Sequence, residues 1–309
     1  MKVGIDIGGT LIKMVVDGST DSVDLCQLID SQPLIQFKCI KLRDKVVYKM
    51  ILPRKKIDQF WSLLMRLKPY LIDSQINVTG GGAFCYRQEF EVKGYELNVE
   101  WEFNALVKGL FNLTEVKPES FYLLEGVDFK PEIFTSQICP SLIVNLGSGF
   151  SFNMIMSRKE HYMVGGSSFG GSTIIGYAAR MFGINDFNVI ISIFERIEAQ
   201  MTDESKQHKV VHNVIEKELN QSKNDGSFLI SESKINSLSI DEYRDQMIYG
   251  FMIKILHNVS DLAFVQAKST GLDHVFFTGS FIDSNLAMQR TIARKLIELD
   301  IKYGYSVKV

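Results

Sequence analysis

The sequence predicts an α/β protein made of two similar lobes with a cleft between them. At 309 residues, the chain exceeds the roughly 100–200 residues of a typical single domain. A short strand, a glycine turn and a second short strand occur near the start of each half of the chain. In both halves a later strand ends in glycine and leads to a helix. We therefore expect an N-terminal lobe at residues 1–140 and a C-terminal lobe at residues 141–309.

The elements of the first lobe follow from its turn residues and apolar periodicity. Val3–Ile7 and Leu11–Val16 are expected to be strands joined by Gly8-Gly9-Thr10. A polar, proline-containing connection at 115–140 closes the lobe. Between them, the spacing of apolar residues predicts a strand at 46–52, an amphipathic helix at 57–71, a strand at 76–79 that ends in three glycines, and a helix at 103–111.

The second lobe repeats the opening pattern. Strands are expected at 141–146 and 150–156, on either side of Gly147-Ser148-Gly149. The polar stretch 201–236 indicates a solvated helix or an insertion. Beyond these, we expect a helix at 173–183, a long helix that begins at the capping box Ser239-Ile-Asp-Glu242, a strand at 275–278 that ends at Gly279, and a helix near 286–299.

Composition excludes several classes of partner. The chain has 34 basic and 36 acidic residues, well mixed along its length, and 46% of its residues are apolar. This balance provides no electrostatic footprint for nucleic acid or an anionic membrane. No secretory signal is apparent, and apolar stretches such as Phe187–Phe194 fall short of bilayer length. We therefore expect a cytoplasmic protein with no nucleic acid partner and no membrane insertion.

The four cysteines are too widely spaced to suggest a zinc site, which usually requires closely spaced pairs of ligands. They are expected to be buried structural thiols in a reducing compartment. They are Cys26, Cys39, Cys85 and Cys139.

The two glycine turns are candidate phosphate-binding loops. Adjacent backbone N–H groups bind an anion, and glycine reaches positive φ without placing a Cβ in the way. The first turn comprises Asp6, Gly8, Gly9, Thr10 and Lys13, in which Thr10 adds a hydroxyl donor, Lys13 neutralises charge and Asp6 binds Mg²⁺ through water. The second comprises Gly147, Ser148 and Gly149. The alternative is that the glycines only end the hairpins, but two such turns half a chain apart favour phosphate binding. The usual P-loop and dinucleotide motifs do not occur.

The motifs taken together resemble the eukaryotic-type pantothenate kinases, which belong to the actin/hexokinase/Hsp70 superfamily. The similarity keeps its order and spacing over nearly the whole chain. It is carried by G-I-D-I-G-G-T-L-I-K at 4–13, T-G-G-G-A-F at 79–84, E-F-N-A-L-V-K-G at 102–109, L-I-V-N-L-G-S-G-F-S at 142–151, G-G-S-S-F-G-G-S-T at 165–173 and F-F-T-G-S-F at 276–281.

The resemblance implies a two-lobed, duplicated ribonuclease-H-like fold and an ATP- and Mg²⁺-dependent kinase. Such an enzyme phosphorylates pantothenate in the first step of coenzyme A synthesis, forms a homodimer, and is inhibited by acetyl-CoA or CoA. By the same resemblance, Glu102 is the catalytic base. One of Glu102 and the neighbouring Glu100 is only a surface or capping charge, and the register of the motif favours Glu102 as the base. It also implies that Gly279 contacts ATP, and that the substrate or acyl-CoA site includes Ser148, Ser151, Gly81 and Gly165.

Three departures from the family pattern bear on activity. Met163 occupies the position of a family arginine that helps to bind substrate, and a thioether cannot replace a guanidinium. Arg158 lies five residues before Met163 and replaces the family arginine only if the loop between them adopts a different register. The polar run Lys217–Asn236 replaces a Gly- and Tyr-rich segment of the family. The end at Ser306–Val309 is shorter than that of the family, so we expect a shortened second lobe with either weaker nucleotide binding or an uncovered strand edge.

Two other functions remain open. One is a pseudokinase of the same fold that binds nucleotide or acyl-CoA as a regulator; Met163 and the short C-terminal end favour it. The other is a sugar kinase, which is disfavoured because sugar kinases generally use an aspartate base. An actin-like or chaperone role has no supporting segment in the sequence.

Overall fold

The computed structural model forms two compact units. Unit 1 comprises residues 1–123, 132–138 and 155–161, and unit 2 comprises 124–131, 139–154 and 162–309. The predicted boundary at residue 140 stays a prediction. The structure describes residues 1–17, 36–42, 45–72, 75–125, 130–133, 138–202, 239–283 and 285–303.

Unit 1 is built on a six-stranded sheet with the order β3-β4-β2-β1-β5-β6. The pairs β3–β4, β4–β2 and β2–β1 are antiparallel. The pairs β1–β5 and β5–β6, on the other side of β1, are parallel. The register places Asp6 of β1 opposite Lys13 of β2 and Thr79 of β5. The strands are β1 (Val3–Ile7), β2 (Leu11–Asp17), β3 (Gln36–Leu42), β4 (Lys45–Pro53), β5 (Gln75–Thr79) and β6 (Glu96–Val99).

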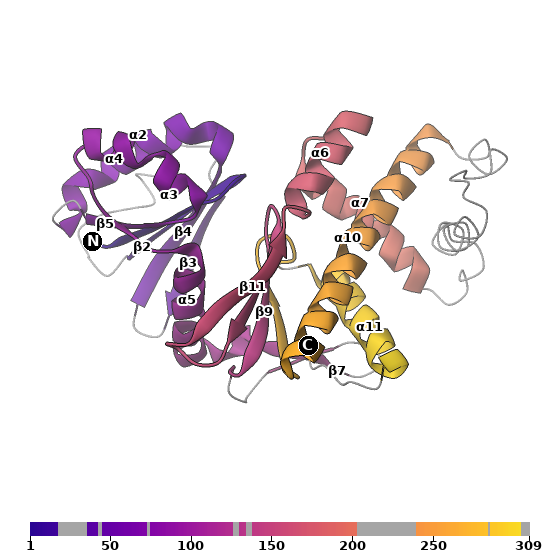
Figure 1. Ribbon diagram of the computed structural model, residues 1–309. Helices are drawn as coiled ribbons and strands as arrows, with labels where there is room; N and C mark the ends of the chain where they lie inside the picture. The colour runs from indigo at the N-terminus through magenta and orange to yellow at the C-terminus, as the bar shows by residue number, and fades with distance from the viewer. Residues whose placement is uncertain are drawn as a thin grey trace. The chain divides into compact units, whose positions relative to one another are not determined.

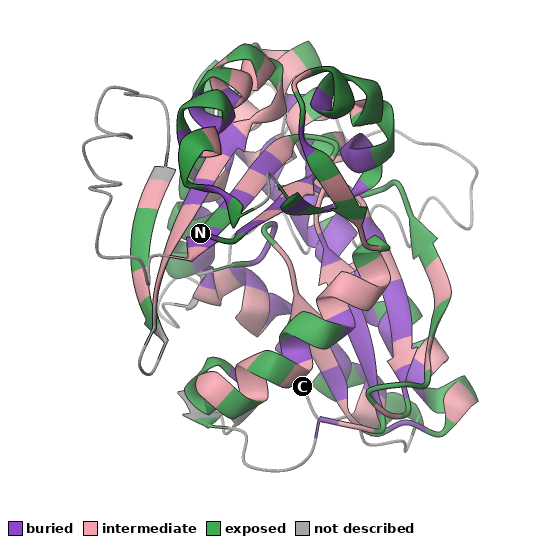
Figure 2. Ribbon diagram, turned by 90° about the vertical axis from the view of Figure 1, so that its left-hand side faces the viewer, coloured by how far each residue is buried: buried purple, intermediate pink, exposed green. Residues whose placement is uncertain are grey.

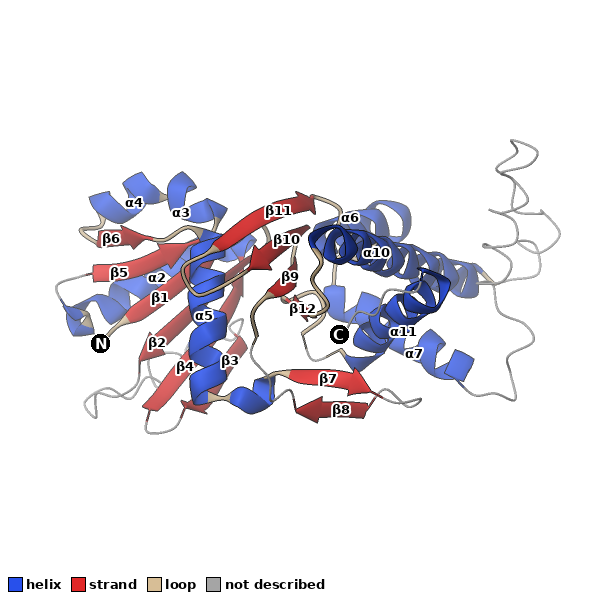
Figure 3. Ribbon diagram, turned by 60° about the horizontal axis from the view of Figure 1, so that its bottom comes forward, coloured by secondary structure: helices blue, strands red, loops and turns tan. Residues whose placement is uncertain are grey.

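Helices cover both faces of this sheet: α2, α3 and α4 lie on one face and α5 on the other (Figures 1 and 3). They are α2 (Ile57–Leu67), α3 (Gly81–Cys85), α4 (Arg87–Val92) and α5 (Glu102–Val116), with 3₁₀ turns at Arg54–Lys56, Lys68–Tyr70 and Pro118–Ser120. Phe60 on α2 packs edge-on against Phe90 on α4, and both are fully buried in the core of unit 1. Helix α2 ends before the predicted residue 71, because Pro69 lies in the 3₁₀ turn Lys68–Tyr70 that follows it.

Unit 2 is built on a four-stranded sheet with the order β11-β10-β9-β12. Its helices pack on the sheet through one continuous apolar core (Figure 1). Figure 2 shows the buried residues gathered along the strands and the inner sides of the helices. The elements are β9 (Ser141–Leu146), β10 (Phe150–Ile155), β11 (His161–Ser167), α6 (Gly171–Phe182), α7 (Phe187–Thr202), α10 (Ile240–Thr270), β12 (Val275–Thr278) and α11 (Leu286–Tyr303); a separate ribbon pairs β7 (Tyr122–Glu125) with β8 (Lys130–Ile133).

The same construction occurs in both sheets. A hairpin opens each sheet, and the first strand of the hairpin pairs in parallel with a later strand that ends in Thr-Gly. In unit 2 this register places Asn145 opposite Thr278, just as Asp6 lies opposite Thr79 in unit 1. The predicted duplicated α/β fold is therefore confirmed.

The glycine after each of these parallel strands lies in the positive-φ region, with φ of 84° at Gly80 and 115° at Gly279. A Cβ at Gly80 would lie 2.6 Å from the carbonyl oxygen of Ile7, and one at Gly279 would lie 2.0 Å from that of Leu146. Both carbonyls belong to the last residue of the neighbouring strand. Glycine is thus required twice, at equivalent places.

Helix α10 starts at the predicted capping box. The Ser239 hydroxyl accepts a hydrogen bond from the Glu242 backbone N–H, and the Glu242 carboxylate accepts one from the Ser239 N–H. Contrary to the expectation about apolar stretches, this 31-residue helix is long and apolar enough to cross a membrane. However, 56% of its most apolar window is buried inside the fold, where it packs against α7 and α11. Packing in the core of unit 2 accounts for its apolar character.

Several elements lie where the sequence predicted none: β3, β6, α3, α4, β7, β8, β11 and α7. Strands β3, β6 and β11 are at sheet edges and bury little apolar surface, so their sequences lack clear alternation. The expected polar stretch 201–236 lies outside the described residues apart from the end of α7, as do Lys217–Asn236 and Ser306–Val309.

The prediction that the cysteines are buried is wrong for those that the structure describes. Cys39 and Cys85 are exposed and Cys139 is partly exposed, all as free thiols. Cys39 lies on the edge strand β3, and Cys85 is the last residue of the short helix α3. Cys26 lies outside the described residues.

Candidate active site

The first glycine turn is closed by its own strands. The Gly8 N–H donates a hydrogen bond to the Leu11 carbonyl at 2.9 Å, and the Arg54 N–H donates one to the Thr10 carbonyl at 2.8 Å. The Arg54 side chain also donates to the Gly8 carbonyl through Nη1 at 3.4 Å. Gly8 does not lie in the positive-φ region, so this part of the phosphate-loop prediction is wrong. Its N–H points into the turn, and Gly9 and Thr10 form the exposed tip.

Asp6 and Lys13 form a charged pair across β1 and β2. Lys13 Nζ lies 3.0 Å from Asp6 Oδ2, and both side chains are about one-third exposed, at 34% and 29%. Gly80 leaves room for this carboxylate, because a Cβ there would lie 2.7 Å from Asp6 Oδ1. Among the described residues no group of three or more potential metal ligands occurs. A nucleotide-bound Mg²⁺ needs only one or two carboxylates beside phosphate oxygens and water, so Asp6 fits that role.

Glu102 is the first residue of α5, and its side chain reaches solvent. Nearby protein atoms displace part of the hydration of its carboxylate, and this desolvation raises its pKa. The negative charge of Asp6 raises the pKa further, while the positive charge of Lys13 opposes the rise. The structure therefore brings together Asp6, Lys13 and Glu102, and among the described residues no hydrogen bond or ion pair occupies the Glu102 carboxylate.

Glu100 is in a different situation. Its carboxylate pairs with Lys108 and accepts a hydrogen bond from Asn104 Nδ2 at 3.2 Å. These two contacts, the first of them the larger, lower its pKa. The geometry agrees with the prediction that, of the two neighbouring glutamates, Glu100 has the structural role.

The second glycine turn is packed from the side by the glycine-rich segment that follows β11. The Gly171 N–H donates to the Gly147 carbonyl at 2.9 Å, and the Ser172 N–H donates to the Ser148 carbonyl at 3.0 Å. A Cβ at Gly149 would lie 2.4 Å from the Ser167 carbonyl oxygen. Neither glycine of the turn has positive φ, so that expectation is wrong here too. Glycine is needed at 149 because two backbones approach closely.

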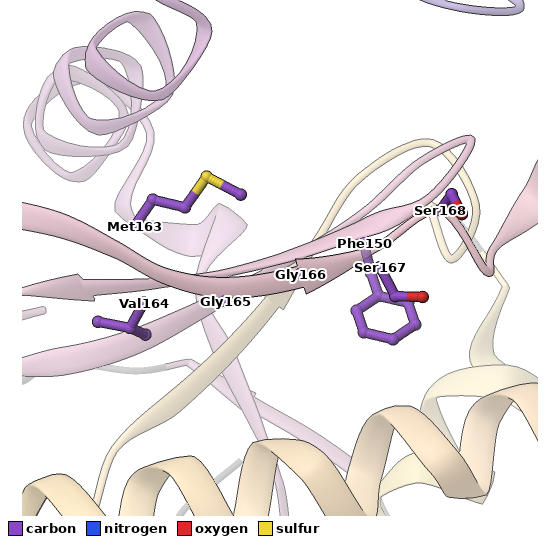
Figure 4. A pocket seen from close by; sticks show the side chains of 7 residues that line it. All are labelled: Phe150, Met163, Val164, Gly165, Gly166, Ser167 and Ser168. Atoms are coloured by element: carbon purple, nitrogen blue, oxygen red, sulfur yellow. The ribbon is translucent and has the colours of Figure 1, made fainter.

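The predicted substrate residues of unit 2 are dispersed. The Ser151 hydroxyl on β10 accepts a hydrogen bond from the buried Asn153 side chain at 3.0 Å. Gly165 lies on β11 and lines an open hollow of about 610 Å³ together with Phe150, Met163, Val164, Gly166, Ser167 and Ser168. Met163 is 62% exposed and points to the opposite side of β11 from Val164 (Figure 4).

Arg158 does not take the place of the missing family arginine. Its guanidinium Nη2 lies 2.8 Å from Glu115 Oε1, and its Cζ lies 5.3 Å from the centre of the Phe111 ring. Both partners are on α5, so the suggested compensation by Arg158 is wrong for this arrangement.

Two further predicted residues are glycines with contrasting surroundings. Gly81 starts α3 and is exposed, and a Cβ there would meet nothing within 4 Å. Gly279 is constrained by the Leu146 carbonyl, and the Phe281 N–H donates to that same oxygen at 3.2 Å. The requirement for glycine at 279 is therefore explained by packing. Sequence reasoning missed Arg54, Asn104 and His161. Arg54 reaches the first turn and His161 reaches Asn104 of α5 only in the folded chain, and those contacts give no signal in the sequence.

The two sheets, each a hairpin with a parallel strand ending in Thr-Gly, define a duplicated α/β protein of the ribonuclease-H-like class. The profile of the Fumble family matches residues 2–297. The chain therefore belongs to the Fumble family.

Curated relatives are similar over most of this chain. A 4'-phosphopantetheine phosphatase from Mus musculus is 29% identical over 236 residues, which cover 73% of this chain and 28% of that protein. Pantothenate kinase 2 from Arabidopsis thaliana is 28% identical over 229 residues, which cover 71% of this chain and 24% of that protein. Pantothenate kinase 1 from the same plant is 25% identical over 289 residues, which cover 90% of this chain and 74% of that protein. The chain thus spans about a quarter of the length of the first two relatives.

Solved structures with a similar arrangement include two glucokinases. One, from Balamuthia mandrillaris in complex with glucose, has a TM-score of 0.43 and 12% identity, covering 96% of this chain and 84% of the other. A ROK family glucokinase from Streptomyces griseus in complex with glucose and AMPPNP has a TM-score of 0.42 and 11% identity, covering 96% of this chain and 89% of the other.

Proposed function

We propose that this chain is an ATP-dependent kinase that transfers the γ-phosphate to the hydroxyl group of pantothenate. Membership of the Fumble family and the pantothenate kinases among its relatives support this activity. The observation that carries the proposal is the state of Glu102: its carboxylate has a raised pKa beside Asp6 and Lys13, and it has no ion-pair or hydrogen-bond partner in the described part of the chain. A carboxylate with a raised pKa is a stronger proton acceptor than an ordinary glutamate.

In the proposed reaction Glu102 accepts the hydroxyl proton as the substrate oxygen forms a bond to the γ-phosphorus. The bond from that phosphorus to the β–γ bridging oxygen breaks, and ADP leaves with the electron pair. Lys13 and Arg54 lie beside the first turn and neutralise phosphate charge, and the backbone at the exposed tip of that turn, Gly9 and Thr10, contacts the phosphates. When bound with ATP, Mg²⁺ supplies further charge neutralisation, and Asp6 would hold it through water.

The test is phosphorylation of radiolabelled pantothenate by the purified chain with MgATP. Glu102→Gln should lower kcat by about 10²- to 10⁴-fold, because it removes the proton acceptor. Binding of a fluorescent ATP analogue should not change. Glu96→Gln, an exposed residue on β6, is the control and should retain wild-type activity. Equal activity of the Glu102→Gln and wild-type proteins would refute the role of Glu102.

A second candidate function is regulation by binding without turnover, and the exposed thioether of Met163 favours it. Absence of product at high enzyme concentration, with measurable acetyl-CoA binding, would support this candidate over the kinase. If the chain is a kinase, Met163→Arg should raise turnover or lower the KM for pantothenate. An unchanged or higher KM would show that residue 163 is not the substrate-binding position. Feedback by acetyl-CoA, a homodimer and a cytoplasmic location belong to the same proposal.

A further inference from the structure

The N-terminal end of α5 is held by side chains that do not include an ordinary helix cap. Trp101 occupies the N-cap position, and no side chain in the described ranges caps the first turn. Instead, Asn104 Nδ2 donates to Glu100 Oε1 at 3.2 Å and so bridges the residues two positions before and two positions after Glu102. Without such a bridge the first turn of a helix tends to fray, and Glu102 is the first residue of this turn.

Both ends of this bridge are anchored in unit 1. On the near side, the Glu100 N–H donates to the Val78 carbonyl at 2.9 Å, and the Thr79 hydroxyl donates to the Glu100 carbonyl at 2.9 Å. These bonds fix Glu100 to strand β5. The Lys108 ammonium pairs with the free oxygen of the Glu100 carboxylate.

On the far side, the anchor is His161, where the segment 155–161 joins unit 1. His161 Nε2 lies 3.0 Å from Asn104 Oδ1, and the Phe103 ring packs edge-on against the imidazole with centroids 5.0 Å apart. One side chain therefore contacts both residues that follow Glu102.

The available donors determine the directions of the two hydrogen bonds that join Glu100, Asn104 and His161. Asn104 uses its amide nitrogen on Glu100, so its oxygen faces His161 and must accept. Nε2 of His161 therefore carries the proton. Nδ1 is buried and has no hydrogen-bond partner among the described residues, so the contacts that hold the ring are the hydrogen bond to Asn104 and the packing against Phe103. A buried nitrogen without a partner is costly, which indicates that the contacts on the other side of the ring outweigh this cost.

We propose that His161 is a positioning residue for Glu102 and acts through Asn104 and Phe103 to hold the first turn of α5. The proposal rests on the proposed function for its kinetic consequence but not for its geometry. A displacement of about 1 Å in a reacting group costs on the order of 10²-fold in rate, so a helix start held on both sides is a direct means of controlling the position of Glu102.

The kinetic test compares His161→Leu with His161→Gln. Leucine keeps the volume but cannot donate to Asn104, whereas the amide of glutamine reaches the place of Nε2 and can donate. We expect His161→Leu to lower kcat by about 10- to 100-fold with little change in the KM for ATP, and His161→Gln to restore most of it. Arg158→Ala is the control in the same hairpin, because it removes an exposed ion pair with Glu115 and a cation–π contact with Phe111, both far along α5 from Glu102, and it should leave kcat within about 2-fold. Equal kcat values for the leucine and wild-type proteins, or equal loss with leucine and glutamine, would overturn the proposal.

A measurement independent of turnover separates this proposal from the kinase assignment. ¹⁵N NMR of histidine-labelled protein should show the His161 tautomer with the proton on Nε2. ¹³C NMR of the Glu102 carboxyl group should give a titration that moves in His161→Leu and returns in His161→Gln. If the chain makes no phosphopantothenate but these shifts occur, the kinase function fails and the positioning role stands. A proton on Nδ1, or a Glu102 titration unchanged in His161→Leu, would refute the positioning role.

Discussion

Replacing either of the positive-φ glycines with alanine should destabilise the protein far more than an ordinary surface substitution. Gly80 has φ 84° and ψ 163°, a region that is nearly exclusive to glycine, and such backbone strain costs about 1–3 kcal/mol. The new Cβ would also lie 2.6 Å from the Ile7 carbonyl oxygen. Relieving that overlap requires a shift of β1, and overpacking of this kind costs about 1–3 kcal/mol more. We therefore expect Gly80→Ala to lose about 2–6 kcal/mol in free energy of unfolding.

The same reasoning applies to Gly279→Ala in unit 2, where the overlap with the Leu146 carbonyl oxygen is closer, at 2.0 Å. Each unit offers a matched control in an exposed helical glycine whose added Cβ would meet nothing within 4 Å. These controls are Gly109 on α5 and Gly176 on α6. Alanine at either control should stabilise the protein by about 0.5–1 kcal/mol, because glycine has the greater conformational freedom in the unfolded chain.

Equilibrium urea unfolding can assign each loss to its unit. The sequence has two tryptophans, Trp61 and Trp101, and both lie in unit 1, so tryptophan fluorescence reports on that unit alone. Far-UV circular dichroism reports on both units. Gly80→Ala should lower the fluorescence midpoint, and Gly279→Ala should lower the midpoint of the dichroism signal. A midpoint for either variant equal to that of the wild type would refute the packing argument.

Three further predictions concern hydrogen bonds and charge. Burial raises the pKa of Tyr95 to about 12, so the free energy of unfolding of the wild type should fall as pH rises from 10 to 12. The fall that Tyr95 causes should be at most about 1.4 kcal/mol per pH unit. Urea unfolding of Tyr95→Phe over this pH range should lack that part of the fall. Ser239→Ala removes the N-cap of α10 and should cost about 0.5–2 kcal/mol by thermal unfolding, whereas Ser239→Asp should cost little. In kinase assays, activity should fall as pH decreases through the raised pKa of Glu102. Lys13→Met should move this fall to higher pH, and Asp6→Asn should move it to lower pH, because the two residues have opposite effects on the pKa of Glu102. A displacement in the opposite direction would contradict the charge assignment.

Much of the fold was predictable because its central elements carry strong local signals. The hairpins at both lobe starts, the helix around Phe60 and the capping box at Ser239 each combine periodic apolar residues with a turn or cap residue. Edge strands do not carry this signal. Strand β11 exposes Tyr162 and Met163, and its position is fixed by pairing with β10, which depends on contacts that no short window of sequence contains.

The candidate site was predictable to the level of residue types and less so in its geometry. The helical pattern predicted a helix at 103–111, directly after Glu102, whereas the role of Glu102 as the base came only from the family resemblance. The mistaken expectation was that glycines in the turns mark positive φ, since glycine also serves where two backbones approach closely, as at Gly149. His161 could not be identified from the sequence, because its contact with Asn104 joins residues 57 positions apart.

The two sheets repeat one backbone design but differ in charge at the equivalent positions Asp6 and Asn145. The backbone requirement is the same in both, which is why Thr-Gly recurs after each parallel strand. A carboxylate at this place needs a counter-charge, and Lys13 supplies it from the facing strand. Asparagine has the same shape and needs none. Packing alone therefore accounts for the glycines at positions 80 and 279, and the proposed chemistry uses side chains that differ from the repeat: Asp6, Lys13 and Glu102.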